Sequence, residues 1–157
     1  MSDEISRLRR ILADYRNVAV VGLSANWHRP SYFAAKYLLD HGYNVIPVNP
    51  AYEEVLGRKC YPDLRSVPEP VDVVDIFRKP EEVPALVEDA IAIGAKVVWM
   101  QIGVIHEEAA ATAREAGLDV VMNRCMKIEY GRLFGGLNWM GVNTGVISAR
   151  RAGADLK

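Results

Sequence analysis

The sequence predicts an α/β fold built on a doubly wound parallel sheet of five strands, in the order 3-2-1-4-5 and with helices on both faces. Two observations lead to this prediction. Five short β-rich runs alternate along the chain with segments of helical periodicity, a pattern typical of right-handed βαβ crossovers. The first of these runs, 17–23, is also continuously apolar, as is expected of a strand covered on both faces. A chain of 157 residues is long enough to form one domain with a hydrophobic core.

Each element follows from its local pattern. Apolar residues at helical spacing predict an amphipathic helix at 4–16, packed on the domain. The β-rich runs are 17–23, 43–49, 71–77, 95–103 and 118–123. Helices are predicted between them at 31–41, 81–93 and 106–117, the first closed by Gly42 as a C-terminal cap. The long connection 50–70 is turn-rich, with room for one short helix, and such a length in a compact domain usually has a function.

Composition excludes several classes of protein. Nineteen basic residues against twenty acidic ones leave a net charge of −1, so neither nucleic acid nor an anionic membrane is the expected partner. Cys60 and Cys125 form no CxxC pair, which argues against a zinc site and a disulfide framework. The N-terminus lacks the apolar region of a signal peptide, and no run approaches the ~20 apolar residues of a membrane span. The expected location is the cytoplasm.

The loop after the first strand, "GLSANWHRPS", resembles a phosphate-binding loop with only one glycine, Gly22. A dinucleotide fingerprint needs three glycines, the second of which lets the backbone approach a pyrophosphate. Here Ser24 offers a hydroxyl instead, and Arg29 offers a positive charge. The next helix begins near Pro30 and Ser31, so its free N–H groups and dipole face the loop. An anion fits this place, although a tight turn without a ligand is the alternative.

The end of the second strand indicates which anion. An NAD site has an acidic residue there to bind the ribose diol. This strand ends Val48-Asn49-Pro50, with no acidic residue before Glu53, and Arg58 follows. A neutral turn with a cation nearby accommodates a phosphorylated ribose better than a bare one. NADP and coenzyme A (CoA), with its 3′-phosphate, both carry such a ribose.

The third and fourth strands contribute further polar groups at the same edge. The third ends Phe77-Arg78-Lys79. Together with Arg29, these cations could balance a pyrophosphate and a phosphate monoester, although each alone could be a solvated charge. Gln101, at the end of the fourth strand, can both donate and accept where an amide-rich pantetheine arm would pass, or it is a satisfied strand-end side chain.

No catalytic constellation is readable from the sequence. The three histidines, His28, His41 and His106, stand in no nucleophile–base arrangement, and G-x-S-x-G is absent. The aspartates of "DVVD" (72–75) point to opposite faces of a strand and form no carboxylate pair. Cys125 lies between two cations that would lower a thiol pKa, but a structural cysteine is the commoner case. We therefore assign no catalytic residue and no metal site.

Taken together, "VAVVGLS…RPS", "VIPVNP", "DVVDIFR", "VVWMQIG" and "EAGLDVVMNRCMKIE" resemble the small stand-alone CoA-binding family. Its fold is similar to the N-terminal CoA-binding domain of the succinyl-CoA synthetase α subunit, and the resemblance covers about residues 5–133. It implies a Rossmann-like domain that holds the ADP part of CoA between the first loop and the second strand's turn, with pantetheine running past Phe77 and Arg78 toward Gln101. The synthetase's loop is richer in glycine, so Ser24 and Arg29 would have to compensate. Its second domain, with a phosphorylated histidine, has no counterpart here, so the ligase reaction does not carry over.

We therefore expect a domain at 1–133 that binds CoA or an acyl-CoA, acting as a carrier, sensor or regulatory protein without catalysis of its own. An NADP-dependent oxidoreductase is one alternative. An interaction module with a vestigial nucleotide crevice is the other. The Gly- and Asn-rich segment 134–157 is expected to pack on the domain or to serve a subunit contact, so a homo-oligomer or a protein partner is possible.

Overall fold

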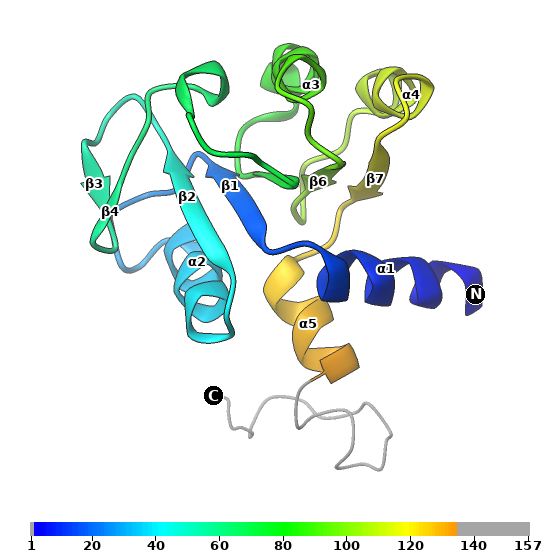
Figure 1. Ribbon diagram of the computed structural model, residues 1–157, viewed down its shortest axis with the longest axis horizontal. Helices are drawn as coiled ribbons and strands as arrows, with labels where there is room; N and C mark the ends of the chain where they lie inside the picture. The colour runs from blue at the N-terminus through cyan, green and yellow to red at the C-terminus, as the bar shows by residue number, and fades with distance from the viewer. Residues whose placement is uncertain (1, 135–157) are drawn as a thin grey trace. The chain divides into compact units, whose positions relative to one another are not determined.

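A computed structural model of the chain describes residues 2–134, and residues 14–125 within it form one compact unit around a parallel sheet (Figure 1). The strand order is β2-β1-β5-β6-β7, and every neighbouring pair is parallel. The strands are β1 (Asn17–Val21), β2 (Asn44–Val48), β5 (Val73–Ile76), β6 (Val97–Met100) and β7 (Asp119–Met122). The predicted fold class and all five strands are confirmed.

The predicted strand order is wrong at one place. The sequence placed the third strand outside the second, whereas β5 pairs with β1 over Val18↔Val73 to Val21↔Ile76. The reason lies at the outer edge of β2. Pro47 has no N–H for a further ladder, its carbonyl accepts from the backbone of Tyr61 at 3.0 Å, and that segment covers the edge. The winding therefore reverses between β1 and β5, where ligands of such sheets bind.

Helices cover both faces of this sheet, as predicted. They are α2 (Pro30–Asp40) on one face, and α3 (Val83–Ala92) and α4 (Glu107–Glu115) on the other (Figure 1). The α3–α4 side holds the main apolar core, where Val87 and Ala110 of the helices pack with strand residues such as Ile76 and Met100. Gly42 ends α2 at φ +90°, which confirms its predicted role as a cap.

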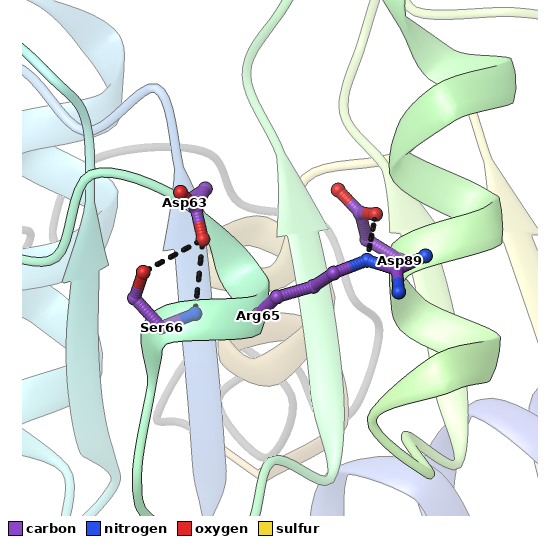
Figure 2. A network of polar contacts seen from close by, with 4 residues as sticks. All are labelled: Asp63, Arg65, Ser66 and Asp89. Carbon is purple, nitrogen blue, oxygen red and sulfur yellow. Dashed lines mark hydrogen bonds and ion pairs between the residues drawn. The ribbon is translucent and has the colours of Figure 1, made fainter.

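The long connection after β2 contains more structure than one short helix. It forms a hairpin of β3 (Glu54–Val55) and β4 (Arg58–Lys59), then the 3₁₀ turn η1 (Leu64–Ser66). Figure 2 shows how η1 is held: the Asp63 carboxylate accepts from the N–H and the hydroxyl of Ser66 at 2.9 and 2.8 Å, and Arg65 reaches Asp89 of α3 at 2.6 Å.

Asp63 is expected to matter more for stability than Arg65. Asp63→Ala removes the cap of η1 and should lower the free energy of unfolding by about 1 kcal/mol. Arg65→Ala breaks an ion pair whose arginine is largely exposed, which should cost less than about 0.5 kcal/mol. Urea unfolding of both variants tests this; equal losses would show that the cap is not what stabilises the turn.

Two further helices belong to a second compact unit. They are α1 (Ser2–Asp14), which confirms the predicted N-terminal helix, and α5 (Met126–Phe134), which was not predicted. In this unit Arg9 lies over the ring of Phe134, 5.6 Å from its centroid. Of the predicted C-terminal segment 134–157, residues 135–157 lie outside the described part. Within residues 2–134, none of the helices has the length and apolar character needed to cross a bilayer.

Candidate functional site

The carboxyl ends of β1, β2 and β5 surround a hollow of about 290 Å³. Seven residues that the sequence predicted line it: Gly22, Ser24, Arg29, Ser31, Asn49, Phe77 and Arg78. Pro30 and Tyr52 also line it and were not predicted as ligand contacts. The site therefore lies at the point where the winding of the sheet reverses, between the first loop and the end of β5.

Gly22 allows the loops after β1 and β5 to lie against each other. Its φ is +88°, and its N–H donates to the carbonyl of Val48 at 2.8 Å. A Cβ at this position would overlap the carbonyl oxygen of Phe77 and would lie 2.8 Å from Cδ of Arg78. Only glycine meets both demands, which explains why one glycine remains in a loop that otherwise lacks them.

Side-chain hydrogen bonds fix the loop between Gly22 and α2. The hydroxyl of Ser31 accepts from the N–H of Ser24 at 3.0 Å, and the hydroxyl of Ser24 accepts from the N–H of Asn26 at 3.0 Å. The side chain of Asn26 accepts from the N–H of His28 in turn, also at 3.0 Å. Because both hydroxyls accept within the loop, their protons are left to donate into the hollow that they line.

Asn49 ties this loop to the end of β2. Its Nδ2 donates to the carbonyl of Leu23 at 3.1 Å, and its Oδ1 accepts from the N–H of Ala51 at 2.9 Å. A neutral amide thus stands at the place where a diol-binding carboxylate would be needed for NAD. Among the described residues, none that lines the hollow is acidic.

Positive charge converges on the hollow from two elements. Arg29 precedes α2, whose first residue is Pro30, and no side chain caps this helix end. Arg78 follows β5 and donates from Nε to the carboxylate of Glu82 at 2.8 Å. Two guanidinium groups, a helix N-terminus and two hydroxyls make a site that suits phosphate groups.

Five residues predicted for the site do not line this hollow. Val48 contributes its carbonyl to Gly22, and Pro50 follows Asn49 in the turn. Lys79 precedes the short 3₁₀ turn η2 (Pro80–Glu82). The remaining two, Arg58 and Gln101, are directed elsewhere by contacts of their own.

Arg58 lies toward the opposite end of β2. Its guanidinium donates to Oδ1 of Asn44, the first residue of β2, at 2.7 Å. It lines a second hollow of about 430 Å³ beside the outer edge of β2, together with Lys59, Tyr61 and others. The hairpin reverses the chain before Arg58, which is why proximity in sequence to Asn49 does not bring the two together.

Gln101 turns into the protein instead of toward the hollow. It is buried and donates from Nε2 to Oδ1 of Asp75 in the middle of the sheet. Asp75 is fully buried, and within the described residues its Oδ2 has no hydrogen-bond partner. Burial raises the pKa of Asp75 to about 7, and the hydrogen bond from Gln101 opposes that rise. The sequence signal for it was an aspartate, Asp75, between the apolar residues Val74 and Ile76 of a predicted strand.

Cys60 lacks the features of a reactive thiol. Cys60 is buried beside the site, its Sγ 3.4 Å from the carbonyl of Asn49, and burial raises the pKa of its thiol. Cys125 is half-buried and forms no disulfide within the described residues. Over residues 2–134, no group of three or more His, Cys, Asp or Glu side chains is placed to hold a metal ion.

Comparison with known proteins places this chain in a family. A family model described as "CoA binding domain" matches residues 16–131. An uncharacterized protein of Bacillus subtilis, YneT, is 37% identical over 125 residues, which are 80% of this chain and 93% of that protein.

A solved structure of a hypothetical protein from Pyrococcus horikoshii is 50% identical, with a TM-score of 0.82, and the match covers 83% of this chain and 92% of that one. An ADP-forming acetate–CoA ligase of Archaeoglobus fulgidus is 29% identical over 69% of this chain, which spans only 17% of the ligase. The match of the family model to most of the chain, supported by these relatives, leads to one conclusion: the protein belongs to the CoA-binding domain family.

Proposed function

We propose that the hollow at the ends of β1, β2 and β5 binds CoA or an acyl-CoA, and that the protein acts in the cytoplasm as a carrier, sensor or regulatory protein without catalysis of its own. The observation that carries the proposal is the pair Arg29 and Arg78 beside the N-terminus of α2, in a hollow without an acidic lining residue. CoA presents a pyrophosphate and a 3′-phosphate, so it needs more positive charge than a bare dinucleotide.

The position of Arg78 supports a role for it in binding one part of the ligand. In doubly wound sheets the pyrophosphate lies at the first turn and the helix N-terminus after it. Arg78 packs on Gly22 of that turn, since a Cβ on Gly22 would lie 2.8 Å from its Cδ. We therefore propose that Arg78 binds the pyrophosphate, while the ribose phosphate lies toward Asn49 at the end of β2.

Arg78→Ala is expected to weaken CoA and dephospho-CoA equally, by about 10- to 100-fold, because a charge-assisted hydrogen bond of about 1.5–3 kcal/mol is lost from both. Arg58→Ala is the matched control: its guanidinium is bonded to Asn44 outside the hollow, so the affinity for either ligand should stay within about two-fold. Isothermal titration calorimetry measures all four affinities.

The same titrations include NADP and NAD. Binding of NADP without CoA would replace the proposal by an NADP-dependent oxidoreductase. No binding of any of the four ligands would favour an interaction module with a vestigial crevice. A loss confined to CoA in Arg78→Ala would move Arg78 from the pyrophosphate to the 3′-phosphate.

A further inference from the structure

The loop after β6 presents two large apolar side chains to solvent. Ile102 is 62% exposed and Ile105 is 46% exposed, and they flank the buried Val104. Exposed single aliphatic residues are ordinary on protein surfaces, but these two lie on one short turn after β6, the strand next to β5, and residues after β5 line the hollow.

Three hydrogen bonds hold this turn and its two ends in place. The N–H of Gly103 donates to Oδ1 of Asn123, which follows β7, at 2.8 Å. The N–H of Val104 donates to the carbonyl of Gln101 at 2.8 Å. His106 caps α4 by accepting from the N–H of Ala109 at 3.1 Å. The two isoleucines are therefore displayed by a fixed turn, and they need no reordering to bind something.

The order of the strands indicates which part of the proposed ligand reaches this turn. With the ribose at the end of β2 and the pyrophosphate at the end of β1, the ligand continues over β5 and reaches β6. The ends of β1 and β6 are two strand spacings apart, about 10 Å. A pantetheine arm is longer than this span, so it is long enough to bring the sulfur and its acyl group to the turn at 102–105.

We propose that Ile102 and Ile105 bind the acyl group of a CoA thioester, and that the preferred acyl group is an uncharged aliphatic chain. The proposal rests on the proposed function of the hollow. The two side chains offer apolar surface and no hydrogen-bond donor. The next residues, Glu107 and Glu108, are exposed in the first turn of α4, and their carboxylates disfavour an acyl group that ends in a carboxylate.

Calorimetric titration of the full chain with CoA, acetyl-CoA, hexanoyl-CoA and succinyl-CoA tests this. Full burial of one methylene is about four-fold in affinity, so a half-covered chain gains about two-fold per carbon. Hexanoyl-CoA should bind on the order of ten-fold more tightly than acetyl-CoA, and succinyl-CoA no more tightly than acetyl-CoA. The double variant Ile102→Ser/Ile105→Ser should lose the preference for hexanoyl-CoA and keep its affinity for CoA. Ile102→Leu is the matched control and should keep the preference.

The outcomes are distinct. Equal affinities for hexanoyl-CoA and acetyl-CoA, tighter binding of succinyl-CoA, or a preference that survives in the double variant would each overturn the assignment while CoA binding itself stands. A double variant that changes its oligomeric state by light scattering and leaves the acyl preference intact would show that the patch is a protein contact. Failure of the wild-type protein to bind CoA would instead overturn the proposed function, and this assignment with it.

Discussion

Gly22→Ala is expected to lower the free energy of unfolding by roughly 2–5 kcal/mol, the sum of a strained left-handed backbone and an overlap with a neighbouring carbonyl. At φ +88° any side chain is strained, and the added Cβ would meet the Phe77 carbonyl, which belongs to backbone. The two loops can separate only by disturbing the hydrogen bond from Gly22 to Val48 and the position of Arg78. Binding of CoA should therefore be lost at temperatures where the variant is still folded.

Gly42→Ala is the matched control for this prediction. Gly42 has nearly the same backbone angle, φ +90°, but a Cβ there would meet nothing within 4 Å. Gly42→Ala should lower the free energy of unfolding only by the conformational strain, about 1–2 kcal/mol, and leave CoA binding unchanged. Urea unfolding and calorimetry separate the two variants. If both lost the same stability, the close contact between the first loop and the end of β5 would not be the reason for the glycine.

Most of the sheet could be predicted from the sequence because its strands are buried on both faces. Mostly apolar runs such as 17–23 and 71–77 leave little choice of structure. The strand order was predicted wrongly although a signal for it was present. Pro47 lies within the second run, and a proline there marks an edge strand, whereas the order 3-2-1-4-5 would have made that strand internal.

Two elements escaped prediction for physical reasons. The helix α5 contains Gly131 at its centre, and its buried positions include Glu129, so it shows no regular apolar stripe. The strands of the hairpin β3–β4 are two residues long, too short for any periodicity. The hairpin is also what carries Arg58 away from the hollow. The candidate site could be predicted to the extent that it depends on strand ends, which meet at one edge, and not where side-chain direction decides, as for Gln101.

The free energy of unfolding is expected to fall as pH rises from about 4 to about 7, because Asp75 holds its proton more tightly in the folded protein than in the unfolded chain. Burial raises the pKa of Asp75 from 3.8 to about 7, so between these values the folded protein holds a proton that the unfolded chain has released. The raised pKa means that ionisation destabilises the folded state. The loss begins above the unfolded pKa and levels off above pH 7.

Asp75→Asn isolates this effect from the other titrating groups. Asparagine keeps an oxygen to accept from Gln101 and has no proton to lose. One pKa unit corresponds to about 1.4 kcal/mol, so the stability of Asp75→Asn relative to wild type should rise by roughly 2–3 kcal/mol between pH 5 and pH 8. The fixed cost of the unpartnered amide N–H is the same at every pH, so it cancels in the change of this difference between pH 5 and pH 8.

Gln101→Leu should raise the pKa of Asp75 further, which shows that Asp75 is the group that titrates. The hydrogen bond from Gln101 is the one interaction within the described residues that stabilises the ionised carboxylate, and it lowers the pKa of Asp75 against the larger effect of burial. Without that donor the pKa should move above 7, so the decline in stability should extend to higher pH than in wild type. Chemical unfolding of the three proteins from pH 4.5 to pH 9 measures both shifts. A constant difference between wild type and Asp75→Asn across that range would mean that Asp75 ionises as readily in the folded protein as in the unfolded chain, so that water or a cation reaches its second oxygen.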